Sequence, residues 1–324
     1  MDGNEDGATD DRKEATNAVT ATIDARSRTG AGPSASFEGR AVGLLAGSGR
    51  FPILFAEAAR RQGLRVACVG IRGEAPETLA GLCDSFDVVP VTTPSRIIGA
   101  FKRRGVRDLV MAGKVHKTAM YTPFLFWHAI SDPRARRVWY RGALRRDKKD
   151  DTILLTVIDE FAKDGLSFRS ALDFCPELLV NHGVLTRRRP SRSELEDIRF
   201  GWHLAKEMGR LDVGQSVAVK DCAAIAVEAI EGTDRCIERA GQLCRSGGWT
   251  LVKVAKPQQD MRFDVPTVGL GTIEKLREAG ARVLAIEAGK TIVIDRPEVV
   301  ALADRLGITL VALDSAEVLE GTPA

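Results

Sequence analysis

From residue 40 to residue 313 the chain alternates short apolar runs with helix-forming segments, and this alternation limits the possible folds more than any other feature. Residues 41–46 and 108–112 are examples of the apolar runs, and turns containing Gly or Pro follow them. Strands that alternate with helices at this spacing form parallel sheets with right-handed crossovers. The sequence therefore predicts an α/β protein.

The expected elements fall into two groups along the chain. In the first group the predicted strands are residues 41–46, 64–70, 88–91 and 108–112, and the helices are residues 53–62, 94–104 and 153–163. In the second the strands are residues 215–220, 223–229, 249–255, 282–286, 291–294 and 309–313, and the helices are residues 194–208, 235–245, 272–279 and 297–306. Residues 169–186 show no regular pattern.

A chain of 324 residues is long enough for two domains. Residues 1–38 are rich in Asp, Ala, Thr, Gly and Ser, and we expect a disordered leader there. A Rossmann-like N-terminal domain, with a parallel sheet that binds a nucleotide or phosphate, is predicted over residues 39–188. A C-terminal α/β catalytic domain is predicted over residues 189–324. Residues 187–193 are basic, contain one Pro and are a candidate linker.

Composition excludes several classes of protein. The net charge of +3 is small for this length and argues against a nucleic-acid binder. The six cysteines contain no CxxC pair, which indicates reduced thiols in the cytoplasm. The four histidines lack HxxxH spacing, which argues against a zinc hydrolase. No apolar run is long enough for a transmembrane helix, and the first residues do not form a signal peptide.

The segment KPQQDMRFDVPTVGLG, residues 256–271, follows a predicted strand and concentrates charge. It contains Lys256, Asp260, Arg262 and Asp264. Charges of both signs at the end of a strand suit a site that holds a metal and a phosphate. A surface turn with internal salt bridges is the open alternative.

Two glycine-containing turns follow strands of the first group. Gly47-Ser48-Gly49 precedes a helix, where backbone N–H groups and the helix dipole attract a phosphate. A third glycine and an acidic residue for a ribose are missing, which disfavours a dinucleotide oxidoreductase. Gly113-Lys114-Val115 would lie on the same edge of the sheet, with Lys114 placed to neutralise a phosphate. A plain tight turn and a solvated lysine are the alternatives.

Residues 114–149 combine aromatic and basic side chains. The aromatic ones are Phe124, Phe126, Trp127, Trp139 and Tyr140. A helical pair with a solvated basic face is one interpretation, and a surface for membrane or anionic lipid is the other.

Six segments in the same order resemble one family, the UDP-2,3-diacylglucosamine pyrophosphatases of lipid A biosynthesis, in the form unrelated to calcineurin-like phosphoesterases. They are residues 43–49 with Pro52, 112–115, 150–155, 209–215, AVEAIEGTD at 226–234 and KPQQDMRFDVPTVG at 256–269. The metal motifs of the calcineurin-like form, DxH and GNH[DE], are absent. The chain departs from the family pattern at Lys117-Thr118 and in the leader.

The resemblance implies a hydrolase that uses Mg²⁺, with Mn²⁺ as an alternative, and two α/β domains with the active site in the cleft between them. It implies cleavage of UDP-2,3-diacylglucosamine to UMP and 2,3-diacylglucosamine 1-phosphate, with attack on the phosphate attached to the sugar. The diacylated substrate implies a transient contact with the inner-membrane surface by a cytoplasmic protein. A homodimer is left open.

On this interpretation Asp264 is the principal catalytic acid, with Asp260 assisting and Lys256 neutralising phosphate charge. Asp264 and Asp234 are the expected metal ligands. The expected substrate contacts are Gly47, Ser48, Gly49, Gly113, Lys114, Val115, Lys220, Thr233, Gln259 and Thr267. Two other classes remain open: a nucleotide-dependent oxidoreductase and a non-catalytic protein that binds a nucleotide sugar or lipid.

Overall fold

The computed structural model describes residues 39–115, 132–144 and 150–320. The described chain forms two compact units. The N-terminal unit extends to Leu178 and also includes Met261–Phe263, and the C-terminal unit contains Leu179–Asp260 and the chain from Asp264 onward. The predicted leader, Lys117-Thr118 and the aromatic residues 124–127 lie outside the described residues.

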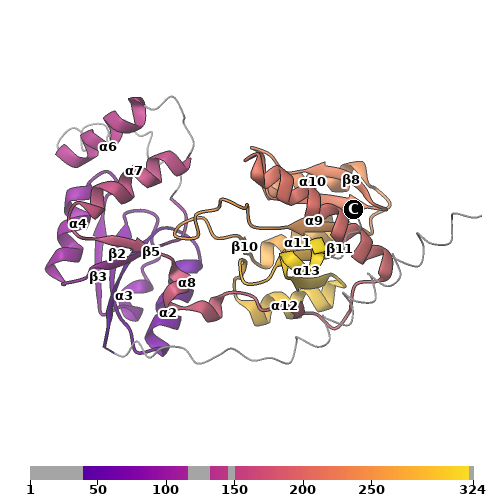
Figure 1. Ribbon diagram of the computed structural model, residues 1–324. Coiled ribbons are helices and arrows are strands. Elements are labelled where there is room, and N and C mark those ends of the chain that lie inside the picture. Colours follow the sequence, from indigo (N-terminus) through magenta and orange to yellow (C-terminus); the bar gives the residue numbers. More distant parts are fainter. Residues whose placement is uncertain (1–38, 116–131, 145–149, 321–324) are drawn as a thin grey trace, which may run out of the picture. The chain divides into compact units, whose positions relative to one another are not determined.

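The N-terminal unit is built on a parallel five-stranded sheet in the order β3-β2-β1-β4-β5 (Figure 1). The strands are β1 (Ala41–Ala46), β2 (Arg65–Ile71), β3 (Ser85–Val89), β4 (Asp108–Ala112) and β5 (Ser167–Arg169). The helices are α2 (Phe51–Arg61), α3 (Leu79–Leu82), α4 (Pro94–Arg103), α6 (Pro133–Leu144), α7 (Asp150–Ala162) and α8 (Ala171–Phe174), followed by the 3₁₀ turn η2 (Pro176–Leu178). The predicted parallel sheet is thus confirmed.

Alternate side chains of these strands enter two apolar cores. One core packs α2, α3 and α8 against the sheet through Leu44, Phe55 and Phe174. The other packs α4 and α7 against it through Phe101 and Phe161. Both faces of the sheet are therefore covered, as the continuous apolar runs of its strands require.

The C-terminal unit contains a mixed six-stranded sheet in the order β6-β13-β11-β9-β7-β8. Strands β9, β11 and β13 are parallel, while β6, β7 and β8 pair antiparallel with their neighbours. The strands are β6 (Gly183–Val184), β7 (Ser216–Lys220), β8 (Ala223–Val227), β9 (Trp249–Lys253), β11 (Ala281–Glu287) and β13 (Thr309–Leu313). A separate pair is formed by β10 (Thr267–Val268) and β12 (Ile292–Val293).

Helices cover both faces of this sheet as well. They are α9 (Arg192–Arg210), α10 (Thr233–Leu243), α11 (Leu270–Glu278), α12 (Arg296–Leu306) and α13 (Ser315–Glu320). Ile237, Ile273 and Val299 from α10, α11 and α12 fill one core. Trp202 from α9 and Val318 from α13 fill the other. The predicted second α/β domain is therefore confirmed.

The candidate linker at residues 187–193 is an ordered part of the C-terminal unit. The Arg188 guanidinium donates to Thr309 Oγ1 at 2.5 Å and to both carboxylate oxygens of Glu194. Ser191 and Glu194 form a reciprocal capping box at the start of α9. Strand β6 already pairs with β13, so the C-terminal unit begins at Leu179 rather than at residue 189.

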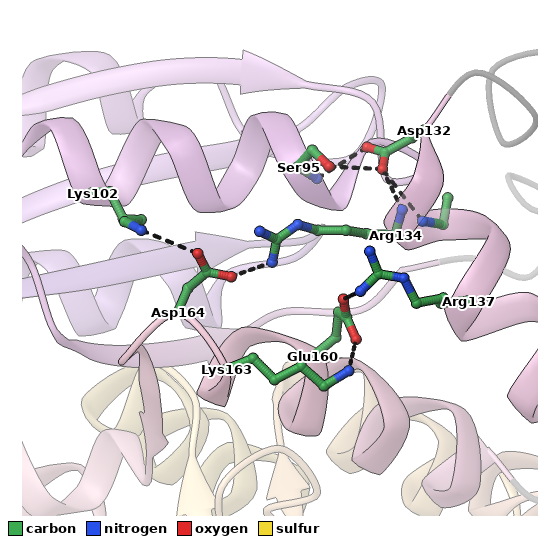
Figure 2. Close-up of polar contacts among 9 residues, drawn as sticks. Ser95, Lys102, Asp132, Arg134, Arg137, Glu160, Lys163 and Asp164 are labelled. Atoms are coloured by element: carbon green, nitrogen blue, oxygen red, sulfur yellow. Dashed lines mark hydrogen bonds and ion pairs between the residues drawn. The ribbon is translucent and has the colours of Figure 1, made fainter.

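Helix α6 is the part of the segment 114–149 that the structure describes as a helix, and it packs against α7 and α4, with part of its basic face paired to acidic residues (Figure 2). Arg134 pairs with Asp164, and Arg137 pairs with Glu160, whose side chain is only 2% exposed. Lys102 on α4 also contacts Asp164, with 3.1 Å between Nζ and Oδ1. These arginines therefore hold α6 in place. No helix in the described ranges has the length and hydropathy needed to cross a membrane.

Candidate active site

In the N-terminal unit the turns after β1 and β4 meet at the carboxyl edge of the sheet. Gly47 N–H donates to Ala112 O at 2.8 Å, and Ser48 and Lys114 form an antiparallel bridge. The strand order reverses between β1 and β4, which is where open α/β sheets bind their ligands. The structure thus brings Gly47, Ser48, Gly113 and Lys114 together.

Close approach of the two turns explains the glycines. A Cβ at Gly47 would lie 2.4 Å from Lys114 O, and one at Gly113 would lie 2.6 Å from Ser48 O. Gly113 also has a φ of +88°, which side-chain-bearing residues rarely adopt. Gly47 and Gly113 therefore have a structural role, whatever they bind.

The hydrogen bonds between the two turns reduce the number of backbone N–H groups that could bind a phosphate. The N–H groups of Gly47 and Ser48 already donate to Ala112 O and Lys114 O. In the first turn of α2, Pro52 has no N–H and Ile53 N–H donates to Arg50 O at 3.1 Å, so the N–H groups left for a phosphate are those of Gly49, which has a φ of +97°, and Phe51. Lys114 and Val115 are exposed beside this turn. The candidate phosphate cradle therefore reduces to the backbone N–H groups of Gly49 and Phe51.

In the C-terminal unit the side chain of Gln259 connects the first and last charged residues of the segment after β9 by hydrogen bonds. Gln259 Nε2 donates to Asp264 Oδ2 at 2.7 Å, while Gln259 Oε1 accepts from Lys256 N–H at 2.8 Å. Asp264 N–H donates to Asp260 O at 3.0 Å. Asp264 is half-buried, and within the described ranges its Oδ1 accepts no hydrogen bond. Gln259 thus fixes one oxygen of Asp264 and leaves the other available to a ligand.

Lys256 is anchored from outside the segment. Its Nζ lies 2.8 Å from Asp212 Oδ1, and Asp212 follows the end of α9. Gln258 Nε2 donates to Gly209 O at 2.8 Å, which is a second tie to α9. The segment is therefore held by its neighbours in the fold rather than by salt bridges within itself alone.

A buried ion pair between Lys206 and Glu287 lies next to this segment and was not predicted from the sequence. Lys206 Nζ on α9 donates to Glu287 Oε2 at 2.6 Å and to Ala255 O at 2.9 Å. Ala255 N–H donates to the same Glu287 oxygen at 2.8 Å. Burial lowers the pKa of Lys206, and the contact with Glu287 opposes that shift. The pair joins α9 to the carboxyl ends of β9 and β11, immediately before Lys256.

Two other buried charges lie at the same edge of the sheet. Glu228 is buried, its Oε1 accepts from Thr233 Oγ1 at 3.0 Å, and its Oε2 has no hydrogen-bond partner in the described chain. Lys253, the last residue of β9, is also buried, and its Nζ donates to Thr267 O at 3.2 Å. Thr233 and Thr267 are thus positioned by charged groups at this edge. A charged residue at the end of an apolar strand was the available signal for Lys253 and Glu287.

Lys220 is not brought to this site. Strand β7 runs antiparallel to β9, with Ser216 opposite Lys253 and Val219 opposite Thr250. Lys220 therefore lies at the amino end of β9, whereas Lys256 follows its carboxyl end. Lys220 Nζ donates to Ser246 Oγ at 2.9 Å and to Gly247 O at 2.8 Å, which is a structural role.

The two expected metal ligands differ in their surroundings. The open Oδ1 of Asp264 is a hard oxygen donor, and Mg²⁺ needs only one or two carboxylates because it retains several waters. Asp264 therefore fits such an ion. Asp234 is exposed at the start of α10 and forms an ion pair with Lys275 on α11. A cation at Asp234 would compete with that lysine.

Comparisons with known proteins cover both units. The chain matches the family model of the LpxI N-terminal domain over residues 41–178 and that of the LpxI C-terminal domain over residues 181–311. It is 32% identical over 288 residues to the UDP-2,3-diacylglucosamine pyrophosphatase LpxI of Caulobacter vibrioides, covering 86% of this chain and 99% of the relative. This chain belongs to the LpxI family.

Proposed function

We propose that this protein is a UDP-2,3-diacylglucosamine pyrophosphatase that releases UMP and 2,3-diacylglucosamine 1-phosphate in lipid A synthesis. The observation that carries the proposal is the match to a relative with that activity over nearly its entire length. The structure supports it through Asp264, in the segment that follows β9. Gln259 binds one oxygen of this half-buried carboxylate, and the other oxygen is available to a ligand.

The substrate sets the demands on the site. A pyrophosphate diester carries two negative charges that repel an attacking water, so hydrolysis needs charge neutralisation and an oriented water more than covalent chemistry. A bound Mg²⁺ would supply charge and lower the pKa of its water. Neither demand requires a nucleophilic side chain.

The residues of this chain divide these tasks. Asp264, held by Gln259, would hold the cation or orient the water through its Oδ1. Lys256 would neutralise phosphate charge, at the expense of its contact with Asp212. In the N-terminal unit Lys114 and the N–H groups of Gly49 and Phe51 would bind the nucleotide phosphate. Water adds to one phosphorus, the bridging P–O bond breaks, and the two phosphates leave on separate products.

One further part of the proposal follows from the substrate. The two acyl chains of the substrate keep it in a membrane, so a transient contact of this protein with the inner-membrane surface is part of the proposal.

Asp260 would assist Asp264 through its backbone. The carbonyl oxygen of Asp260 accepts a hydrogen bond from Asp264 N–H and so stabilises the turn that carries the Asp264 carboxylate.

The test is an Asp264→Asn variant assayed for UMP release with Mg²⁺. Asn keeps an oxygen that accepts from Gln259 but loses the charge, so kcat should fall about 100-fold or more, as when other preorganised electrostatic groups are removed. Asp173→Asn, an exposed aspartate paired with Arg169, is the matched control and should be unchanged. Near-normal turnover by Asp264→Asn would remove this carboxylate from the mechanism.

A further inference from the structure

A second group of potential ligands occurs in the C-terminal unit, away from Asp264. His182, Asp314 and Glu317 each offer one ligand atom, and these atoms lie within 4.8 Å of one another. Among the residues that the structure describes, this is the one group of three such side chains close enough to share an ion. None of these three residues takes part in the proposed hydrolysis.

The fold fixes these three side chains relative to one another. His182 immediately precedes β6, and β6 pairs with β13 so that Gly183 lies opposite Ala312. Asp314 follows β13, and Glu317 lies one turn further along in α13. Trp202 Nε1 on α9 donates to Ser315 Oγ at 3.0 Å and ties α13 to the body of the unit. Glu317 therefore lies in a packed helix, and His182 and Asp314 directly adjoin paired strands.

The polar atoms of His182 and Glu317 are buried without hydrogen-bond partners. The two side chains are 8% and 13% exposed. Both ring nitrogens and both carboxylate oxygens lack a hydrogen bond in the described part of the chain. Leaving buried polar atoms unpaired destabilises the folded state. Such atoms point to a group that the protein binds at this position.

The spacing of the two side chains is that of ligands on one ion. His182 Nε2 lies 3.1 Å from Glu317 Oε2, yet the contact lacks hydrogen-bond geometry. Ligands bound tetrahedrally to zinc with bonds of about 2.0–2.1 Å lie about 3.3 Å from one another. A cation between the two lone pairs would satisfy both groups, whereas a proton requires a directed hydrogen bond.

We propose that His182, Asp314 and Glu317 form a binding site for a divalent transition-metal ion of the zinc class, with water as a further ligand. An imidazole nitrogen favours such ions over Mg²⁺, which prefers oxygen ligands alone. The site lies at the carboxyl end of β13. This is the same sheet edge from which the Lys256–Asp264 segment leaves β9, with β11 between the two strands. It is a second cation site, independent of the proposed Mg²⁺ at Asp264.

The test is a Zn²⁺ titration of the full chain after removal of metals with a chelator, followed by calorimetry. We expect one equivalent to bind, and the His182→Gln and Glu317→Gln variants to bind about 100-fold more weakly. His203→Gln, an exposed histidine on α9, is the matched control and should bind as the unaltered chain does. Co²⁺ should give visible ligand-field bands in the unaltered chain and in His203→Gln only.

Thermal unfolding provides a readout that does not depend on catalysis. Zn²⁺ should raise the Tm of the unaltered chain and of His203→Gln, because a ligand that binds only the folded state stabilises it. Glu317→Gln, which changes no more than one oxygen to an amide nitrogen, should show no Zn²⁺-dependent rise. The proposal is overturned if the unaltered chain binds no Zn²⁺ equivalent, or if Glu317→Gln and His182→Gln bind Zn²⁺ as tightly as it does.

Discussion

Gly113 occupies a position where the backbone of one turn touches the backbone of another. Its φ of +88° and the absence of a Cβ allow Lys114 to bridge to Ser48. The sequence predicts that the glycines of the Gly47–Gly49 and Gly113 turns let a phosphate approach the backbone. In the structure two of them, Gly47 and Gly113, allow the turns to approach each other, whereas an added Cβ at Gly49 would meet no atom within 4 Å.

The Gly113→Ala variant tests this assignment. The added Cβ would lie 2.6 Å from Ser48 O, so we expect a loss of about 2–4 kcal/mol in the free energy of unfolding, combining backbone strain with a steric clash. Gly105→Ala is the control, because Gly105 has a φ of +67° but no atom within 4 Å of an added Cβ. It should lose only about 1–2 kcal/mol in urea unfolding. Equal losses would contradict the clash.

The buried pair Lys206–Glu287 gives a second prediction at this scale. Lys206→Met leaves the Glu287 carboxylate, which is 1% exposed, without its principal partner. We expect the free energy of unfolding to fall by about 3–5 kcal/mol. Arg210→Met on the same helix removes an exposed pair with Glu207 and should change it by less than about 1 kcal/mol. Similar small effects of the two variants would show that the pair does not anchor the Lys256 segment.

At the scale of elements, two carboxylates join α6 to its neighbours in addition to Glu160 of α7, which pairs with α6. Asp132 accepts from Arg134 N–H at the start of α6 and from Ser95 N–H at the start of α4, so one buried side chain joins two helix ends (Figure 2). Asp164 accepts from Arg134 and from Lys102. The basic helix α6 is therefore fixed to α4 and α7 through charge.

Asp164 makes this junction sensitive to acid. The hydrogen bond from Arg134 lowers the pKa of Asp164, and contact with Lys102 adds to the effect. A lowered carboxyl pKa contributes stability above the unfolded value of about 3.9, and this stability is lost as the pH falls through the folded value. Asp164→Asn should therefore be less stable than the unaltered chain at neutral pH, with the difference shrinking in acid. Urea midpoints across the acid range would measure this, and a difference independent of pH would contradict it.

The elements also show what local sequence can and cannot predict. Strands β1, β4 and β13 have the predicted bounds, because each is a continuous apolar run. Strands β5 and β6 were missed because they contain only three and two residues and exist through pairing with β4 and β13. The prediction of a linker at residues 187–193 failed for the same reason, because Arg188 is held by Thr309, which lies 121 residues away in the sequence.

The candidate site, like the fold, could be predicted from the sequence only where its residues are contiguous. The charged segment was located correctly after β9, because its residues are contiguous. Lys220 was among the expected substrate contacts, but the antiparallel register of β7 puts it at the opposite edge of the sheet. Glu287 and Lys206 are 81 residues apart, so only the folded chain reveals the pair. Long-range pairing and register are what the sequence pattern leaves undetermined.

At the scale of the whole molecule, the proposed function assigns residues to the reaction in both units. Gly49 and Lys114 belong to the N-terminal unit, and Lys256 and Asp264 to the C-terminal unit. The segment between Lys256 and Thr267 itself contributes Met261–Phe263 to the N-terminal unit, where Ser170 Oγ donates to Met261 O at 2.8 Å. Activity is therefore expected from the full chain.

The most direct measurement is product analysis with the purified full chain, UDP-2,3-diacylglucosamine and Mg²⁺. The account predicts equimolar UMP and 2,3-diacylglucosamine 1-phosphate, loss of both products when the metal is chelated, and much slower cleavage of UDP-N-acetylglucosamine, which lacks the two long acyl chains. Absence of UMP from the diacylated substrate, or equal rates on the two nucleotide sugars, would contradict the proposed function.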